Sequence, residues 1–198
     1  MQVNPITLRG RHVLLEPLEP RHADALLNVA VDPRIWEFTS APIRNRAEVH
    51  MYVDTALEWQ RAGTAVPFAT LESGSAAVIG STRFENIDVA NRGVEIGWSW
   101  LNPRWWRTPI NTETKYLMLR HAFEEWKCIR VEFKTWVQNQ RSRSAILRIG
   151  AKEEAIMRQR MIGHDGSFRD AVYFSILDDE WPEVKRCLEK RLSQSSIV

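Results

Sequence analysis

The spacing of apolar residues along the chain predicts an alternation of helices and strands. Ala23, Leu26, Leu27 and Ala30 recur at the spacing of one helix face, a stripe typical of an amphipathic helix. Residues 130–137 instead alternate strictly between apolar and polar side chains, as in a strand with one wetter face. The whole pattern predicts helices at 20–31, 46–62, 111–127, 140–149 and 181–192, and strands at 12–17, 67–71, 78–84, 93–101, 130–137, 155–162 and 169–177.

This order of elements predicts a mixed α/β sheet with helices on both faces. The chain has 198 residues and shows no internal repeat, low-complexity tract or Gly/Ser linker, so we expect a single domain over residues 1–198. Residues 93–101 are largely uncharged on both faces except at Glu95. A strand of that kind is usually central and covered on both faces.

Local signals mark where several elements end. Asp32-Pro33 stops the first helix, because the residue before proline avoids the helical region. Gly63 and Gly150 each follow a helix and suit its C-terminal stop. Asp165-Gly166 is a strong turn signal between two strands and predicts a hairpin.

The helix predicted at 111–127 carries polar residues in two distinct settings. Glu113 falls in its expected first turn, where a carboxylate suits the positive end of the helix dipole. His121 is expected on the polar side, away from the apolar stripe that includes Leu119 and Phe123.

The charge balance argues against a nucleic-acid partner. The chain has 27 basic and 25 acidic residues and a formal charge of +2, whereas nucleic-acid binders usually show a concentrated basic face. The arginines between Arg141 and Arg169 have no interleaved stacking aromatics, unlike a single-strand platform. Association with a ribosome through a local basic patch stays an open alternative.

Cysteine and histidine positions do not indicate a metal site. Cys128 and Cys187 lack CxxC or Cys/His spacing, and the five histidines do not cluster at ligand spacing. We therefore expect two reduced thiols and no metal. No segment approaches the roughly 18 apolar residues of a membrane span, and the N-terminus lacks a signal-peptide pattern, so the expected location is the cytoplasm, without a membrane partner.

Nine tryptophans are unusual, and four of them lie between residues 98 and 106. Large aromatic rings contribute much buried area, which favours a heavily packed core. Trp105 and Trp106 are the two that we expect to be partly exposed.

The most informative segment joins residues 93–101 to a basic loop, Arg104 to Pro109, and then to a helix. A helix N-terminus combined with guanidinium groups forms a site for a phosphate-bearing ligand. Surface arginines are more often merely solvated, but the place of Arg104 and Arg107 between a buried strand and a helix start favours phosphate contact.

These residues and the element order resemble the GNAT superfamily of acyl-CoA-dependent N-acetyltransferases, in its RimJ/RimL-type branch of ribosomal-protein N-terminal acetyltransferases. The resemblance covers nearly the whole chain in outline. It rests on Glu95-Ile96-Gly97-Trp98, Leu101-Asn102-Pro103, Asn111-Thr112-Glu113 with Lys115, Asn139 with Arg141 and Ser142, and Gly150-Ala151. The resemblance implies a mostly antiparallel sheet that splays between strands 93–101 and 130–137.

The resemblance also implies acetyl-CoA or coenzyme A as the cofactor. Free backbone groups of the 93–101 strand would hold its pantetheine arm, and the following loop and helix start would bind its diphosphate. The residues expected to contact it are Trp98, Ser99, Trp100, Leu101, Arg104, Arg107, Thr108, Pro109, Ile110, Asn111, Thr112, Asn139, Arg141, Ser142 and Arg143.

The loop departs from the superfamily pattern, Gln/Arg-x-x-Gly-x-Gly/Ala. Arg107 and Pro109 stand where glycines are usual. Glycine permits positive φ and close backbone approach, so some backbone contacts are expected to be lost. The Arg107 guanidinium is expected to offset part of that loss by pairing with phosphate oxygens.

Three residues are candidates for proton transfer. Glu95 is the first candidate for the general base, because burial in an apolar strand raises a carboxyl pKa; the structural alternative is an ion pair with Arg83 or Arg92. Glu154 is the second candidate by resemblance, and a water could replace both. Ser142 would protonate the departing thiolate, although serine is common in a first helical turn without any function.

The acceptor cleft is expected between the loop at 34–39 and the hairpin around 158–168. Its candidate lining residues are Trp36, Phe38, Arg160 and Phe168. This aromatic and basic mixture disfavours a polycationic aminoglycoside and suits a peptide or protein N-terminal α-amine or a small amine. The chain is expected to act as a monomer or homodimer. The alternative is an acyl-CoA-binding regulatory module with the same fold and no turnover.

Overall fold

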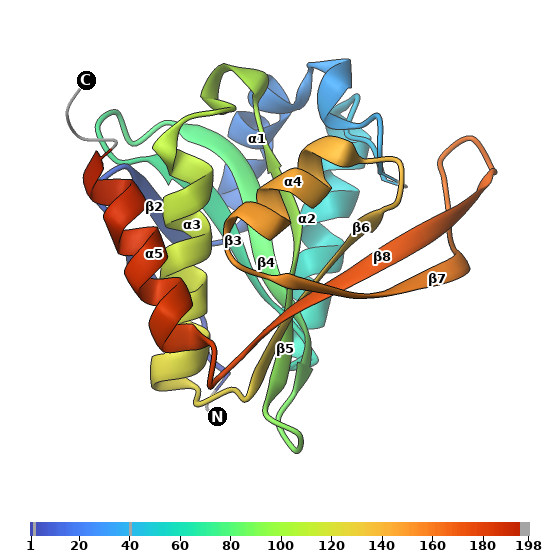
Figure 1. Cartoon of the computed structure of the whole chain (residues 1–198). Coiled ribbons are helices and arrows are strands. Elements are labelled where there is room, and N and C mark those ends of the chain that lie inside the picture. Colours follow the sequence, from blue (N-terminus) through green and yellow to red (C-terminus); the bar gives the residue numbers. More distant parts are fainter. Residues whose placement is uncertain (2, 40, 195–198) are drawn as a thin grey trace.

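The computed structural model describes residues 1, 3–39 and 41–194. Within them, eight strands form one sheet in the order β1-β2-β3-β4-β5-β6-β8-β7, flanked by helices (Figure 1). The strands are β1 (Leu8–Arg9), β2 (Val13–Pro17), β3 (Val66–Glu72), β4 (Val78–Asp88), β5 (Gly93–Leu101), β6 (Arg130–Trp136), β7 (Lys152–Ile162) and β8 (Phe168–Leu177). The main helices are α1 (Ala23–Ala30), α2 (Arg46–Arg61), α3 (Pro109–Arg120), α4 (Gln140–Arg148) and α5 (Trp181–Gln194).

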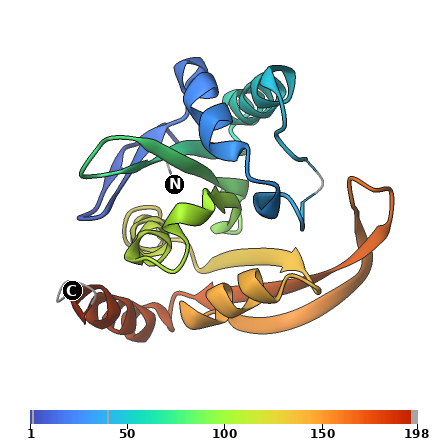
Figure 2. The ribbon, with the colours of Figure 1, turned by 90° about the horizontal axis from the view of Figure 1, so that it is seen from above.

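Helices cover both faces of the sheet, as predicted. Viewed from above, α1 and α2 lie on one side, with α3, α4 and α5 on the other (Figure 2). Each side has its own apolar core. Leu26, Val53 and Trp100 belong to the core under α1 and α2, and Met118 and Leu188 belong to the core that includes α3 and α5. The mixed α/β class is confirmed.

The sheet splays between β5 and β6, and this prediction is also confirmed. These two strands run parallel and pair only from Gly93 to Glu95 with Arg130 to Glu132, whereas the other neighbouring strands pair antiparallel. β5 then continues to Leu101 and β6 to Trp136 without pairing with each other. We call the opening between them the wedge.

A bulge interrupts β5 beside the wedge. Arg83 of β4 pairs with Gly97, and Ser81 pairs with Trp100, so β5 has one extra residue between the two pairs. Trp98 adopts φ 48° at this point. A bulge of this kind bends its strand and redirects backbone groups, and bulges are frequent next to active sites.

The helix predicted at 111–127 and the observed α3 differ at both ends. The observed helix begins two residues earlier, with Pro109 at its first position, which needs no backbone donor there. Residues His121–Glu125 form a π-helix. The wider turn changes which residues near the C-terminal end lie on the same face of the helix. The polar position expected for His121 is wrong. Its ring packs 4.9 Å from the Trp126 ring and 6.2 Å from the Phe84 ring, and burial lowers its pKa.

The expected dipole role of Glu113 is also wrong. Because α3 begins at Pro109, Glu113 lies beyond the first turn and points into the protein. Its carboxylate accepts hydrogen bonds from the backbone N–H groups of Arg11 at 2.9 Å, His12 at 2.6 Å and Val13 at 2.9 Å. Glu113 therefore ties α3 to the turn before β2.

Cys128 is buried and Cys187 is exposed, and both are free thiols, as predicted. Among the described residues, no helix is both long and apolar enough to cross a membrane.

Candidate active site

The wedge leaves one edge of β5 without a strand partner. From Ile96 to Leu101, β5 pairs with β4 on one side but not with β6 on the other. Backbone N–H and C=O groups need partners, so this edge can bind an extended ligand. The Ser99 side chain is exposed in the same segment, while Trp100 is buried and donates from Nε1 to the Tyr52 hydroxyl at 3.2 Å.

The basic loop leads directly from the wedge to the N-terminus of α3. Pro103–Trp105 forms a short 3-10 turn, and Arg104 lies 5.2 Å from the centre of the Trp105 ring. Thr108 is the N-cap residue of α3, but its hydroxyl donates to the Trp105 carbonyl at 2.7 Å and does not cap the helix. The first backbone N–H groups of α3 therefore have no side-chain cap. Ile110 is buried in the core, and Asn111 and Thr112 are partly buried in the first turn.

Arg107 keeps the backbone conformation that the missing glycine would favour. Its φ is 61°, in the left-handed region. A non-glycine residue pays a steric cost there, and such residues occur often at functional sites. Pro109 fits at the first helical position without strain.

The opposite wall of the wedge begins at α4. Asn139 caps this helix, because its Oδ1 accepts from the Ser142 N–H at 3.0 Å. Arg143 is held by the Val137 carbonyl at 3.3 Å and by Glu153 at 3.1 Å. Ser142 is partly buried beside them. The side chains of Asn139 and Arg143 are thus both engaged in hydrogen bonds within the protein.

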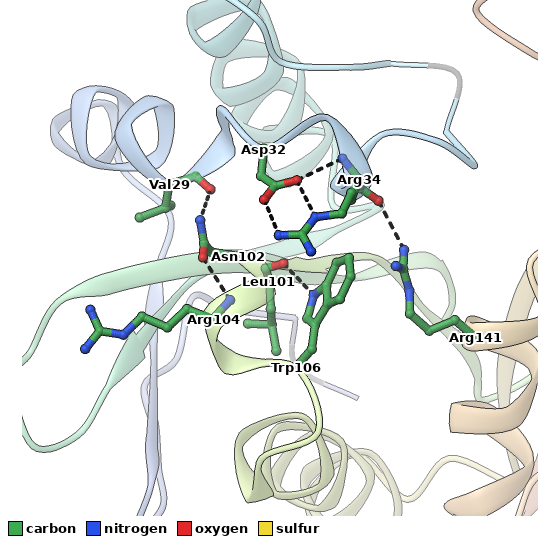
Figure 3. A network of polar contacts seen from close by, with 8 residues as sticks. All are labelled: Val29, Asp32, Arg34, Leu101, Asn102, Arg104, Trp106 and Arg141. Atoms are coloured by element: carbon green, nitrogen blue, oxygen red, sulfur yellow. Dashed lines mark hydrogen bonds and ion pairs between the residues drawn. The ribbon is translucent and has the colours of Figure 1, made fainter.

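Arg141 spans the mouth of the wedge. Its guanidinium lies 3.8 Å from the centre of the Trp106 ring and donates to the Arg34 carbonyl at 3.3 Å (Figure 3). Trp106 in turn donates from Nε1 to the Leu101 carbonyl at 2.8 Å. Trp105 and Trp106 are both partly exposed, as predicted. The contact joins the segment after β6 to the segment after β5.

Glu95 lies at the base of the wedge, on the face of the sheet that α1 and α2 cover. It is only 3% exposed, lies 3.0 Å from Lys134 Nζ and accepts from Asn86 Nδ2 at 2.8 Å. Neither Arg83 nor Arg92, the partners named in the structural alternative, forms this ion pair. The strict alternation of β6 already placed Lys134 on one face, but the parallel register with β5 was needed to bring it to Glu95.

Sequence reasoning missed Glu85, which pairs in register with Glu95 across β4 and β5. Glu85 is 6% exposed and accepts from Trp98 Nε1 at 2.9 Å. Burial, followed by the negative charge of Glu95, raises the pKa of Glu85 to about 7. Because β4 runs to Asp88, beyond the predicted end of the strand at residue 84, Glu85 was not considered as part of the sheet. A carboxylate directly after the apolar run was the available signal.

Arg83 lies on the same strand and is enclosed by aromatic rings. Its guanidinium carbon is 4.9 Å, 5.3 Å and 4.5 Å from the ring centres of Tyr52, Trp59 and Trp98. The side chain is 1% exposed, and its nitrogens have no hydrogen-bond partner among the described residues. Cation–π attraction is strongest in such desolvated positions. Arg83 thereby helps to hold Trp98 at the bulge.

A second polar group lies on the α3 side of the wedge. Lys115 is buried, and its Nζ donates to the Ser99 hydroxyl at 2.5 Å, which in turn lies 2.6 Å from the Thr82 hydroxyl. Burial lowers the pKa of Lys115 to about 7. A buried amine with this pKa exchanges protons near neutrality.

Glu154 lies in a different environment. Its carboxylate pairs with the Arg130 guanidinium and accepts from the Ser175 hydroxyl at 2.7 Å. The bond with Arg130 is the main reason why the pKa of Glu154 is lowered to about 2. A carboxylate so firmly ionised is a weak proton acceptor near neutral pH.

The expected acceptor-cleft residues divide into two groups. Trp36 is buried, donates from Nε1 to the Ala30 carbonyl at 2.7 Å and contacts the Trp100 ring at 5.1 Å. Phe38 meets the Trp136 ring edge-on at 6.4 Å. Arg160 is exposed on the hairpin, and Phe168 is 67% exposed.

The hairpin tip does approach the loop at 34–39. His164 Nδ1 lies 3.2 Å from the Thr39 carbonyl oxygen. This contact joins the loop and the hairpin that are predicted to border the acceptor cleft.

Two cavities lie outside the wedge. One of about 370 Å³ is lined by the C-terminal end of α4 and by α5, and contains none of the candidate residues. The other, of about 250 Å³, is lined by Trp59, Thr64, Glu85 and Asn86. In the described part of the chain, no group of three or more His, Cys, Asp or Glu side chains is arranged to hold a metal.

A known family model matches most of the chain. The model of the acetyltransferase (GNAT) domain matches residues 12–152. The chain belongs to the GNAT acetyltransferase family. It is 29% identical over 180 residues to the "Putative ribosomal N-acetyltransferase YdaF" of Bacillus subtilis (strain 168), covering 87% of this chain and 94% of that protein.

Solved GNAT structures have the same fold as this protein. A GCN5-related N-acetyltransferase from Brucella melitensis is 30% identical, with a TM-score of 0.88 over 96% of this chain and 86% of that chain. Mycobacterium smegmatis RimJ, solved in complex with CoA-disulfide, is 22% identical, with a TM-score of 0.79 over 94% of this chain and 95% of that chain. The RimJ likeness establishes a shared fold.

Proposed function

We propose that this GNAT protein transfers an acetyl group from acetyl-CoA to an amine by direct attack within a ternary complex. The observation that carries the proposal is the wedge. It presents an unpaired edge of β5, a bulge at Trp98 and a basic loop that ends at the uncapped N-terminus of α3.

The residues present fit a coenzyme A molecule. The free edge of β5 from Trp98 to Leu101 suits the amide-rich pantetheine arm, because both are extended and polar. The first turn of α3 supplies N–H groups and a positive dipole end for a diphosphate. Arg104, Arg107 and Arg141 add charge close to that turn. When bound, acetyl-CoA supplies the acetyl group as an activated thioester.

Two further groups in the chain suit proton movement on opposite sides of the wedge. Glu95 is the proposed general base, because it is buried at the base of the wedge, at the last residue of β5 that pairs with β6. Ser142, in the first turn of α4, is the proposed proton donor for the thiolate. Glu154 is the weaker candidate for the base because of its bond with Arg130.

The proposed acceptor is the α-amine of a peptide or protein, or a small amine. The name of the Bacillus subtilis relative supports a ribosomal protein as one candidate acceptor. Phe38, Arg160 and Phe168 are the proposed contacts for the acceptor at the hairpin side, and Trp36 would support that wall from within the core. We expect the protein to function as a monomer or homodimer.

The test is acetyl-CoA binding by calorimetry, followed by thiol release with a panel of peptide and small amines. The proposal predicts binding and amine-dependent release. Binding without release would instead favour an acyl-CoA-binding regulatory module, which the changed loop residues Arg107 and Pro109 keep in consideration. Absence of binding would contradict both functions.

A further inference from the structure

Lys115 and Ser99 form a hydrogen-bonded pair at the free edge of β5. Lys115 projects from the face of α3 that also carries the buried Met118 and Leu119. Ser99 directly follows the bulge at Trp98, and its side chain is exposed. Lys115 Nζ lies 2.5 Å from Ser99 Oγ. The pair therefore joins a buried amine to an exposed hydroxyl where β5 has no partner on the β6 side.

Lys115 lacks the partner that a buried lysine usually has. A buried ammonium is normally paired with a carboxylate, but Lys115 forms no ion pair among the described residues, and burial alone causes its lowered pKa. Glu113, two residues earlier on α3, accepts instead from the backbone N–H groups before β2. The amine of Lys115 is thus directed at a neutral hydroxyl.

Thr82 of β4 fixes the Ser99 hydroxyl from the other side. Its Oγ1 lies 2.6 Å from Ser99 Oγ and 3.7 Å from Met118 Sδ, and the residue is 1% exposed. A hydroxyl, a base within hydrogen-bond reach and a third group that fixes their orientation together characterise an activated nucleophile. Serine–lysine pairs are one form of this arrangement. The pKa of Lys115, about 7, leaves part of the amine neutral, as a base must be.

We propose that Ser99 and Lys115 form a nucleophile–base pair that takes the acetyl group of acetyl-CoA when no acceptor amine is bound, and passes it to water. This inference rests on the proposed binding of acetyl-CoA along β5 and adds a hydrolytic activity to the amine transfer. Ser99 belongs to the free edge from Trp98 to Leu101 that suits the pantetheine arm, so its exposed hydroxyl borders the path of the thioester.

The reaction has two steps. In the first, the Ser99 O–H bond breaks, its proton moves to Lys115 Nζ, and Oγ forms a bond to the thioester carbonyl carbon. The C–S bond then breaks, and the departing thiolate takes the proton from Lys115. In the second step water attacks the Ser99 ester, Lys115 takes a proton from the water, and Ser99 Oγ leaves with that proton. The products are acetic acid and the free thiol of coenzyme A.

The first experiment uses p-nitrophenyl acetate, a small activated ester that needs no pantetheine site. Peptide mass spectrometry after acid quenching should find an acetyl ester on Ser99 that hydroxylamine removes, and Ser99→Ala should lose it. Ser193→Ala, at an exposed position of α5, is the matched control. A wild-type protein that carries no ester on Ser99 and hydrolyses p-nitrophenyl acetate no faster than Ser99→Ala would overturn the proposal.

Two substitutions of Lys115 separate a base from a structural contact. Lys115→Met removes the amine, whereas Lys115→Arg keeps a charged donor for Ser99 that cannot act as a base. Both should slow acetylation of Ser99 by at least about 100-fold, and Lys190→Arg, at an exposed position of α5, should not. Urea unfolding checks that each variant is folded. Wild-type acetylation in Lys115→Arg would contradict the role of Lys115 as the base.

Thiol release from acetyl-CoA separates this inference from the proposed function. Without an amine, the wild-type protein should release thiol in a burst followed by a slow steady rate, and Ser99→Ala should show no burst. If p-nitrophenyl acetate acetylates Ser99 but amines add no thiol release, the amine transfer fails and the pair is upheld. If amines do add thiol release but neither donor acetylates Ser99, the amine transfer is upheld and the role of the pair is wrong.

Discussion

The Arg141 guanidinium lies 3.8 Å from the centre of the Trp106 ring and links the two walls of the wedge at its mouth. The Trp106 ring and the Arg34 carbonyl cover part of the Arg141 guanidinium, and this desolvation lowers the pKa of Arg141. A phosphate group entering this mouth would meet a guanidinium already held in place. Such preorganisation reduces the entropy cost of binding.

Arg141→Ala should therefore weaken coenzyme A binding by roughly tenfold, the value of one charged hydrogen bond. Calorimetry at low and moderate salt would measure it, and the difference between wild type and variant should shrink as salt rises. Arg148→Ala, an exposed arginine at the end of the same helix, is the control. Equal affinities of wild type and Arg141→Ala for coenzyme A would show that Arg141 only joins the two walls of the wedge and does not bind the ligand.

Arg107→Gly should have opposite effects on stability and on binding. Glycine removes the steric strain of the left-handed backbone at residue 107 but increases the conformational entropy of the unfolded chain. The first effect should be the larger one, so the free energy of unfolding should rise by about 0.5 kcal/mol. Loss of the guanidinium should weaken coenzyme A binding by roughly tenfold. Arg104→Gly, in the neighbouring 3-10 turn, should instead lower stability by about 1 kcal/mol. Urea unfolding and calorimetry measure the two effects, and a less stable Arg107→Gly protein would contradict the strain argument.

Lys115 should make stability depend on pH. Its pKa falls from 10.5 to about 7 on burial, so between these values the unfolded chain binds more protons than the folded one. Stability therefore rises with pH across this interval, by roughly 5 kcal/mol in total. Lys115→Met should be more stable than wild type at pH 7 and should lose this dependence.

The measurement for Lys115 is urea unfolding at pH 7 and pH 9.5. Lys190→Met, at an exposed position of α5, is the control and should retain the wild-type dependence. Parallel pH profiles for wild type and Lys115→Met would mean that Lys115 is not desolvated in solution.

Glu113→Gln should destabilise the protein by about 2–4 kcal/mol. The amide NH₂ would face one of the three backbone N–H donors, and the charge that strengthens these bonds would be lost. Glu125→Gln, at an exposed position of the same helical segment, should have almost no effect. Guanidinium denaturation would measure both, and equal stabilities would contradict an anchoring role for Glu113.

Periodicity predicted the fold well because burial dictates it locally. The alternation at 130–137 and the stripe at Leu26 and Ala30 each reflect one face turned to a core, and both elements were confirmed. The start of α3 at Pro109 and the π-helix at His121–Glu125 were missed, because they depend on the packing around the helix ends.

The site was less predictable because it depends on register between strands. Glu95 stood out as a lone carboxylate in an apolar strand, but its contact with Lys134 needs the parallel pairing of β5 and β6. Glu85 acquires its environment only from the antiparallel register that places it opposite Glu95. Arg107 differs from the prediction in the opposite sense. The absence of glycine predicted a changed backbone in the basic loop, but Arg107 itself adopts a positive φ.

A crystal structure with bound coenzyme A tests the central claim most directly. The account predicts the pantetheine arm along β5 from Trp98 to Leu101, with the diphosphate at the start of α3 beside Arg107. Coenzyme A bound elsewhere, with β5 and β6 fully paired beyond Glu95, would contradict it.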